Sequence, residues 1–395
     1  MCNMGIHQPD GDFSKRSHRT FTLIVPKFHA EIVRSTIMEM GLFNPRRSIG
    51  RDDLVRFPIV FETEDAEIGL RSVLDDSRVE YRLEKGTEGT FERIISPTPY
   101  EEVVRRLKGI ISEEDLSKIP AAYERIGDCL VLKLEDLEDS AARSIAKTYM
   151  EVLGSRYVLG DSSGISGEFR EPDFEVLIPP EGGDHEVCHR EGPVRYLLDP
   201  RRIMFSSGNT EERNRFPGRV GSLLPPPRLS EKSGSDDDSP KEITVDMFAG
   251  IGYFSLPLAK GGVNGRIIAV EKNPISYHYL MKNIELNKLN KIIIPVLGDN
   301  RQVLPANIAD RIIMGYVGGT IEFLPRALEL SRPEGCIVHL HDTVGVERGI
   351  SHLLEKARSM AEKDGMSLKL LDSRRVKSYA PRIDHVAMDL LAEHD

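Results

Sequence analysis

The sequence predicts an α/β protein in which smaller α+β units precede a C-terminal domain built on a doubly wound, mostly parallel sheet. From residue 242 onward, apolar runs of strand length alternate with patterns of helical period, which is typical of βαβ units. The chain has 395 residues, more than one hydrophobic core usually serves, so we expect two or three domains.

The C-terminal domain opens with an apolar strand, a glycine turn and a helix, and the alternation continues to residue 344. Residues 368–393 differ, because two strand-like runs are joined by a basic stretch. We expect these two runs to close the sheet as an antiparallel hairpin. The expected parallel strands are 243–248, 266–271, 292–299, 311–317 and 336–344, and the expected helices are 253–260, 274–288 and 321–331.

The residues before 242 show shorter patterns. Strand patterns at 21–27 and 54–62 flank an amphipathic helix pattern at 29–43, and further strands and helices follow between 99 and 199. The stretch 216–241 is rich in Pro, Gly, Ser and Asp, a composition that buries too little apolar surface to become ordered. The predicted division is a disordered tail (1–20), a small α/β domain (21–95), a helical linker (96–118), an α+β middle domain (119–215), a disordered insertion (216–241) and a catalytic domain (242–395).

Composition restricts the class of protein. No apolar run approaches the roughly 18 residues of a membrane span, and the polar N-terminal stretch does not read as a signal peptide, so we expect a cytoplasmic protein without a membrane partner. Four scattered cysteines form no CxxC pair, which argues against a zinc site and a disulfide framework. They are Cys2, Cys129, Cys188 and Cys336.

Charge gives a mixed indication about nucleic acids. The net charge of −10 disfavours an unspecialised nucleic-acid binder, because contact with phosphates requires clustered Lys and Arg. Basic residues nevertheless cluster at 46–51, 201–215 and 373–382. Each cluster is either a solvated surface or a contact for an anionic partner.

The stretch "DMFAGIGYF" indicates a nucleotide-type ligand. Gly250 and Gly252 allow a tight turn and a close approach of the backbone to a ligand at the end of the first strand. Glu271, at the end of the second strand, is placed to accept hydrogen bonds from both ribose hydroxyls. Asp299 and Asn300 end the third strand and can read an adenine edge, although both residues also favour ordinary turns.

These positions together predict an adenosine crevice. The turn lacks the third glycine of the dinucleotide fingerprint, and no GxxxxGK[ST] motif occurs, so an adenosine ligand without phosphates is favoured, and S-adenosylmethionine is such a ligand. We expect Asp246 to orient the glycine turn. His339 and His341 lie two apart on one strand face, but no third ligand accompanies them, so we expect no metal site.

Several segments carry a family resemblance: "FSSGNTEER" (205–213), "VDMFAGIGYFSLP" (245–257), "EKNP" (271–274), "NIELNK" (283–288), "GDNR" (298–301), "NIADRIIMGYV" (307–317) and "HLHDTV" (339–344). They resemble the archaeal form of the wybutosine-pathway aminocarboxypropyltransferase, and the resemblance extends from about residue 119 to the C-terminus. This family shares its Rossmann-like, class I S-adenosylmethionine-dependent transferase fold with the tRNA guanosine-37 N1-methyltransferases. The methyltransferases carry an Arg after the serine of an "FSPRLGTER"-like segment, where this chain has Ser207. They also carry an "NLP"-like motif on strand four, where this chain has Gly315-Tyr316.

The resemblance implies the reaction and its partners. S-adenosylmethionine would donate its 3-amino-3-carboxypropyl group to carbon 7 of 4-demethylwyosine at position 37 of tRNA(Phe), releasing methylthioadenosine. It also implies that Ser206 and Arg213 contact the donor, with Arg213 suited to bind the donor carboxylate bidentately. We expect a monomer that holds tRNA through the basic clusters. A tRNA guanosine-37 N1-methyltransferase and a non-catalytic tRNA-binding protein are the alternatives.

Overall fold

The computed structural model describes residues 19–26, 33, 36–37, 40, 42, 48–49, 54–61, 63–76, 79–85, 98–167, 170–223, 225, 242–263 and 265–394. The chain forms two compact units, Met1–Ser96 and Pro97–Asp395. Within the ranges given, no helix combines the length and apolar character needed to cross a membrane. Most of the predicted tail, most of the expected helix 29–43 and the side chains of the basic cluster 46–51 lie outside the described residues.

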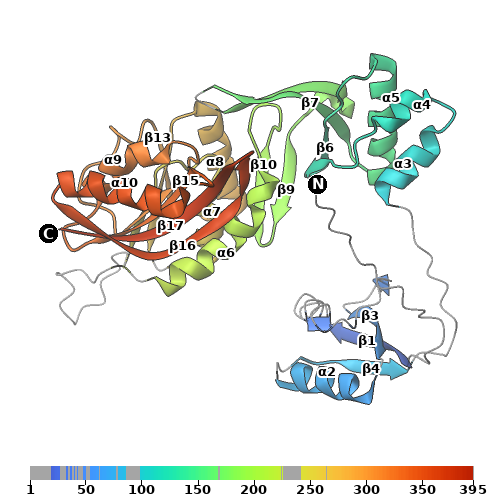
Figure 1. Ribbon diagram of the computed structural model, residues 1–395, viewed down its shortest axis with the longest axis horizontal. Helices are drawn as coiled ribbons and strands as arrows, with labels where there is room; N and C mark the ends of the chain where they lie inside the picture. Colours follow the sequence, from blue (N-terminus) through green and yellow to red (C-terminus); the bar gives the residue numbers. More distant parts are fainter. Residues whose placement is uncertain are drawn as a thin grey trace, which may run out of the picture. The chain divides into compact units, whose positions relative to one another are not determined.

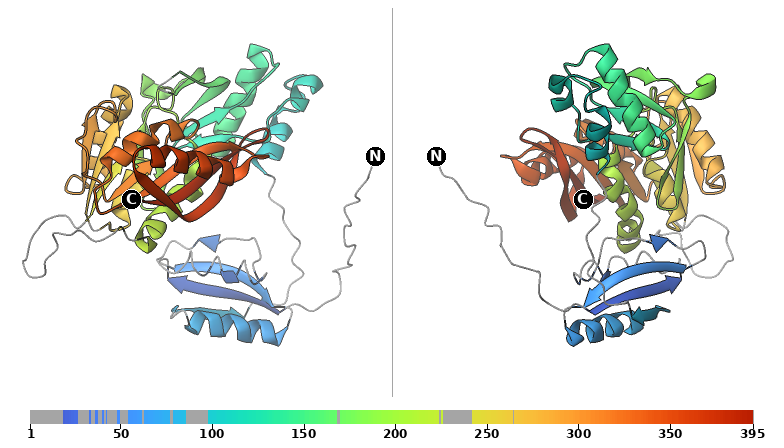
Figure 2. Two further views of the ribbon diagram at one scale, coloured as in Figure 1. Left: turned by 60° about the vertical axis from the view of Figure 1, so that its left-hand side comes forward. Right: turned by 90° about the vertical axis from the view of Figure 1, so that its right-hand side faces the viewer.

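The first unit contains a four-stranded antiparallel sheet in the order β2-β3-β1-β4. Leu23 and Val25 of β1 lie in the core of this unit, because residues two apart point to the same face of a strand. Leu70 and Leu74 of α2 lie one helical turn apart and are buried in the same core. Both views in Figure 2 show α2 along one face of the sheet. The elements are β1 (Arg19–Pro26), β2 (Ser48–Ile49), β3 (Leu54–Phe61), α2 (Glu64–Asp76) and β4 (Arg82–Lys85).

The second unit begins with two short helices, and they are part of its core. Val103 and Leu116 pack with Ile145 and Tyr149 in one buried cluster. The stretch 96–118 contains helices as predicted, but the prediction that it serves as a linker is wrong. A sheet in the order β5-β6-β7-β8 and a separate hairpin follow. The elements are α3 (Pro99–Leu107), α4 (Glu113–Ser117), β5 (Glu124–Ile126), β6 (Cys129–Leu132), α5 (Asp139–Leu153), β7 (Tyr157–Ser166), β8 (Glu171–Ile178), η2 (Glu181–Gly183), β9 (Val187–Glu191) and β10 (Val194–Leu198).

The C-terminal sheet has seven strands in the order β13-β12-β11-β14-β15-β17-β16. The first five are parallel, and β17 pairs antiparallel with both β15 and β16, so the predicted parallel sheet with an antiparallel C-terminal hairpin is confirmed. The elements are β11 (Ile243–Asp246), α7 (Ser255–Lys260), β12 (Arg266–Glu271), α8 (Pro274–Leu286), β13 (Ile293–Leu297), β14 (Arg311–Met314), η4 (Thr320–Phe323), α9 (Leu324–Leu330), β15 (Cys336–Gly345), α10 (Gly349–Lys363), β16 (Met366–Ala380) and β17 (Ile383–His394).

The predicted boundary at residue 215 falls inside a helix. After η3 (Ser207–Asn209), α6 spans Thr210–Ser222, so the first seven residues of the predicted insertion are helical. Phe216 is fully buried and contacts the rings of Phe254 and His339. Figure 1 shows α6 beside α7 and β16, so middle and C-terminal segments share one core. The rest of the insertion is described only at residues 223 and 225.

Candidate active site

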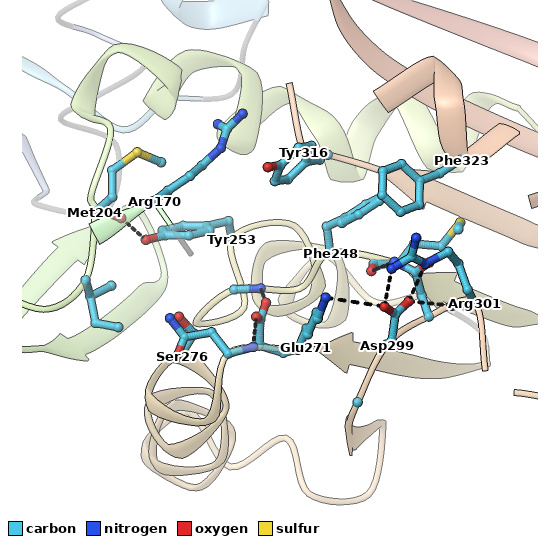
Figure 3. A pocket seen from close by; sticks show the side chains of 18 of the residues that line it. Arg170, Met204, Phe248, Tyr253, Glu271, Ser276, Asp299, Arg301, Tyr316 and Phe323 are labelled. Carbon is cyan, nitrogen blue, oxygen red and sulfur yellow. Dashed lines mark hydrogen bonds and ion pairs between the residues drawn. The ribbon is translucent and has the colours of Figure 1, made fainter. Parts of the chain in front are cut away.

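A pocket opens at the carboxyl ends of β11, β12 and β13, beside β14. The chain crosses from one side of the sheet to the other between β11 and β14, and ligands of doubly wound folds bind at such a switch point. Figure 3 shows side chains from several strand ends converging on it. The lining residues include Gly250, Glu271, Asp299 and Asn300, all of which the sequence predicts as donor contacts.

The glycine turn and the acid of the second strand are joined directly. The Glu271 carboxylate accepts the Gly250 N–H through Oε2 and the Asn273 N–H through Oε1, both at 2.7 Å. Burial raises the pKa of Glu271. Gly250 has a φ of 57°, and a Cβ there would lie 2.7 Å from the Tyr253 ring, so glycine is required. Each carboxylate oxygen keeps a lone pair for a ribose hydroxyl.

Two predicted donor contacts do not line the pocket. A Cβ on Gly252, whose φ is 103°, would lie 2.6 Å from Leu256 Cγ, so this glycine permits packing of the turn rather than approach to a ligand. Asp246 is fully buried, where it accepts the Ser255 hydroxyl at 2.6 Å and the Phe248 N–H at 3.3 Å. Burial raises the pKa of Asp246 to about 6. It therefore supports the turn from beneath and does not face the pocket.

The end of the third strand has the polarity expected of an adenine site. Arg301 donates to the Asp299 carboxylate at 2.9 Å, and Lys272 lies 3.4 Å from it, so hydrogen bonds and positive charge hold its pKa below the usual range. Asn300 donates to the Met247 carbonyl at 2.8 Å. Its Oδ1 is buried and has no hydrogen-bond partner among the described residues. An acceptor left in this state fits the exocyclic amine of adenine.

An aromatic wall completes the pocket. Phe248 stacks on Tyr316 with ring centroids 5.3 Å apart and meets Phe323 edge-on at 5.0 Å. The Arg170 guanidinium lies over the Tyr316 ring at 4.3 Å and donates to the Val317 carbonyl. Figure 3 shows these side chains on the rim opposite Glu271. Such a wall gives a planar ligand a stacking surface.

The loop after β14 is held in an unusual conformation. Val317 has a φ of 49°, which is rare for a β-branched residue. The Asp342 carboxylate accepts the N–H groups of Gly318, Gly319 and Ile321 at 3.1, 2.8 and 2.8 Å. These hydrogen bonds fix the loop that carries Tyr316 into the pocket.

A second pocket contains the other two predicted contacts, Ser206 and Arg213. It adjoins the first, because five residues line both of them: Arg170, Met204, Tyr253, Gly315 and Tyr316. A donor whose adenosine lies in the first pocket would therefore extend its tail into the second.

The expected bidentate contact between Arg213 and the donor carboxylate is not what the structure provides. Glu191 accepts from Arg213 Nε and Nη2 at 2.7 and 2.6 Å, and the Ser206 carbonyl takes a further bond from Nη2 at 2.9 Å. Both charged side chains are 3% exposed. Because Nε and Nη2 are both committed, the N–H groups of Nη1 are left for a ligand, and Arg213 cannot grip a carboxylate through two nitrogens.

Internal ion pairs also use much of the charge in the basic clusters. Carboxylates neutralise several of the arginines on which tRNA binding was expected to depend, and some of these pairs are buried. The pairs are Arg201–Asp199, Arg213–Glu191, Arg374–Glu212, Arg374–Asp389 and Arg375–Asp384. Clustering along the sequence therefore overstates the positive surface.

The two histidines of β15 belong to a buried polar network. His339 Nδ1 lies 2.7 Å from Asp389 Oδ1, and its Nε2 lies 2.8 Å from Arg311 Nη1. His341 Nδ1 lies 3.2 Å from His385 Nε2. In the part of the chain that the structure describes, no three His, Cys, Asp or Glu side chains are grouped to hold a metal ion. These histidines therefore support the fold of the sheet.

Comparison with known proteins identifies the family. Residues 234–370 match the TRM5/TYW2 methyltransferase domain, and residues 103–183 match the TYW2 N-terminal domain. The tRNA(Phe) (4-demethylwyosine(37)-C(7)) aminocarboxypropyltransferase of Methanocaldococcus jannaschii is 38% identical over 267 residues, covering 68% of this chain and 96% of that protein. This chain belongs to that aminocarboxypropyltransferase family.

Two further relatives define the place of this aminocarboxypropyltransferase. The crystal structure of Pyrococcus horikoshii TYW2 in complex with MeSAdo superposes with a TM-score of 0.62 at 33% identity, covering 75% of this chain and all of that one. The tRNA (guanine(37)-N(1))-methyltransferase Trm5b of Pyrococcus abyssi is 28% identical over 372 residues, covering 94% of this chain and 98% of that protein. The predicted class I transferase fold is thereby confirmed.

Sequence reasoning missed most of the aromatic wall of the aminocarboxypropyltransferase. Phe248 and Tyr253 lie inside the glycine motif, so their position in "DMFAGIGYF" was an available signal. Tyr316 was noted only because the methyltransferase motif is absent there. Arg170 gave no signal, because it lies 146 positions before Tyr316, the ring on which it stacks.

Proposed function

We propose that the protein transfers the 3-amino-3-carboxypropyl group of S-adenosylmethionine to carbon 7 of 4-demethylwyosine at position 37 of tRNA(Phe), as a step of wybutosine-type tRNA modification. The observation that carries the proposal is an adenosine-type pocket, in a chain 38% identical to an enzyme named for this reaction along nearly the whole of that enzyme. A bond forms between carbon 7 and the methylene carbon beside the sulfonium, the carbon–sulfur electron pair moves to sulfur, carbon 7 loses its proton, and methylthioadenosine leaves.

The residues of the first pocket would position the donor. Glu271 would accept from the ribose hydroxyls, while Asp299 and Asn300 would receive the adenine amine. The unpartnered Oδ1 of Asn300 supports this assignment. Phe248 and Tyr316 supply the flat surface, and Ser206 lies in the second pocket, on the path of the tail. Because the sulfonium is already a good leaving group, orientation of the reacting carbon is the main task of these side chains.

The products test the proposal. Incubation of the protein with S-adenosylmethionine and tRNA(Phe) bearing 4-demethylwyosine should release methylthioadenosine. Mass spectrometry of the digested tRNA should show the nucleoside heavier by one aminocarboxypropyl group. Release of S-adenosylhomocysteine with addition of a methyl group would overturn the proposal.

One observation favours tRNA guanosine-37 N1-methyltransferase as a second candidate. The Trm5b relative covers 94% of this chain, against 68% for the aminocarboxypropyltransferase of Methanocaldococcus jannaschii. Its identity is lower, at 28% against 38%. A parallel reaction on unmodified tRNA with guanosine at position 37 decides between them, because only the methyltransferase would form 1-methylguanosine.

We also infer that the enzyme works in the cytoplasm as a monomer. The tRNA acceptor of the proposed reaction supports the compartment, and the monomer is tested by mass. Light scattering coupled to size exclusion should give a mass near 44.3 kDa. A mass twice this value would contradict the monomer.

A further inference from the structure

The second pocket contains an ammonium group whose role the sequence does not reveal. Lys377 lies on β16, in the basic stretch 373–382 that was expected to contact tRNA. It lines the second pocket together with Ser206 and Arg213. Its Nζ donates to Ser206 Oγ at 3.1 Å, and a Cβ on Gly208 would lie 2.9 Å from Nζ. The ammonium therefore points into the site rather than away from the sheet.

The surroundings of Lys377 favour an anion. The side chain is half-buried, and both burial and the charge of Arg213 lower its pKa. Within the described ranges the structure shows no ion pair for Lys377. The negative charge of Glu124 raises the pKa of Lys377. The Glu124 carboxylate accepts a hydrogen bond from the Ser207 N–H at 3.3 Å. An ammonium held between a hydroxyl and a second cation is stabilised when a carboxylate joins it.

The other cations of this pocket already have partners within the protein. Its lining includes Arg170, Arg213 and Lys377 as the Lys and Arg residues. Arg170 stacks on Tyr316 and donates to a backbone carbonyl, and Arg213 is paired with Glu191. Among the described residues of this lining, Lys377 is the cation for which the structure shows neither a carboxylate nor a carbonyl partner.

We propose that Lys377 binds the carboxylate of the aminocarboxypropyl group, with Ser206 as a second hydrogen-bonding partner. This inference rests on the proposed function. It assigns the carboxylate to β16, and leaves Arg213 to position Ser206 through the backbone carbonyl at 2.9 Å. Anchoring the far end of the tail restricts rotation about the sulfonium, so the methylene carbon rather than the methyl group faces the acceptor.

Calorimetry without tRNA tests the role of Lys377 with three ligands. S-adenosylmethionine carries the carboxylate, decarboxylated S-adenosylmethionine lacks it but keeps the amine, and methylthioadenosine lacks the whole tail. Lys377→Met should weaken the binding of S-adenosylmethionine by about 10- to 100-fold, which is the usual loss of affinity for a hydrogen bond to a charged group. It should leave the other two affinities unchanged, and Lys377→Arg should restore most of the loss. Lys369→Met, at an exposed lysine of the same strand, is the matched control.

Three results would overturn the assignment. Equal losses for all three ligands would show that Lys377 only supports the shape of the pocket. Unchanged binding of S-adenosylmethionine would exclude the contact outright. Unchanged donor binding with weaker, less salt-dependent tRNA binding would place a tRNA phosphate on Lys377 instead. If the unmodified protein binds neither S-adenosylmethionine nor methylthioadenosine, the proposed function fails before Lys377 is tested.

Discussion

Substitution of Glu271 by Gln tests the ribose assignment with little change of shape. The carboxylate accepts the Gly250 and Asn273 N–H groups on opposite oxygens, both at 2.7 Å. A glutamine has one oxygen and one NH2 group, so one backbone N–H would face another donor whichever way the amide turns. The same exchange removes one of the two acceptors proposed for the ribose hydroxyls.

The expected loss of donor affinity follows from this count of acceptors. One charge-assisted hydrogen bond to the ligand is lost and one polar partner is left without an acceptor, which costs about 1 to 3 kcal/mol. This free energy corresponds to about 5- to 150-fold weaker binding. Because the ribose is common to donor and product, S-adenosylmethionine and methylthioadenosine should lose affinity by the same factor.

Isothermal calorimetry with both ligands measures the effect, at a temperature well below the unfolding midpoint of the variant. Glu285→Gln, at an exposed glutamate of α8, is the matched control, and its affinities should equal those of the unmodified protein. Unchanged binding of both ligands by Glu271→Gln would refute the ribose assignment. A loss confined to S-adenosylmethionine would instead place Glu271 beside the tail.

Three further substitutions test the supports of the site by urea unfolding. Burial raises the pKa of Asp246 from 3.8 to about 6, so the folded state holds this proton more tightly than the unfolded state does. As pH rises from about 4 to about 6, the free energy of unfolding of the unmodified protein should therefore fall relative to that of Asp246→Asn. Parallel pH curves for the two proteins would contradict this. Gly252→Ala should lower the free energy of unfolding by about 1 to 3 kcal/mol, because the alanine Cβ would lie 2.6 Å from Leu256 Cγ. A variant as stable as the unmodified protein would disprove the packing role. Arg213→Met should lower the free energy of unfolding by about 3 to 5 kcal/mol, because Glu191 would stay buried without its ion-pair partner. The double variant Arg213→Met, Glu191→Met should recover part of that loss. A double variant that loses as much as the two single variants together would contradict this reasoning.

The sheet and the residues that meet in the first pocket could be predicted because their signals are local. Strand and helix periods repeat over short windows, and the turn at Gly250 directly follows the strand that ends at Asp246. Glu271 could be found because parallel strands bring their carboxyl ends to the same edge. Here adjacency in the chain and adjacency in space are linked by the geometry of the βαβ unit.

The tail half of the site could not be predicted, because its contacts join distant segments. Arg213 was a sound candidate to bind the carboxylate of the donor, but its guanidinium is paired with the Glu191 carboxylate of β9. Lys377 was grouped with a basic stretch, although β16 carries it to Ser206, 171 positions earlier. Charge patterns along a sequence do not show which carboxylates will pair with them, so the ion pairs needed the tertiary structure.

We expect the second unit to decide which group the enzyme transfers. The Trm5b match covers 94% of the chain, so it can omit only 6% of 395 residues, about 24, and must include most of Met1–Ser96. The aminocarboxypropyltransferase of Methanocaldococcus jannaschii covers 68% of the chain with 96% of its own length. A protein can therefore carry this reaction's name without covering the whole of this chain. The described residues that line both pockets belong to Pro97–Asp395, so we expect the choice between methyl and aminocarboxypropyl transfer to depend on side chains of the second unit. The loop at Tyr316 and the tail pocket at Ser206 are where that choice would be made.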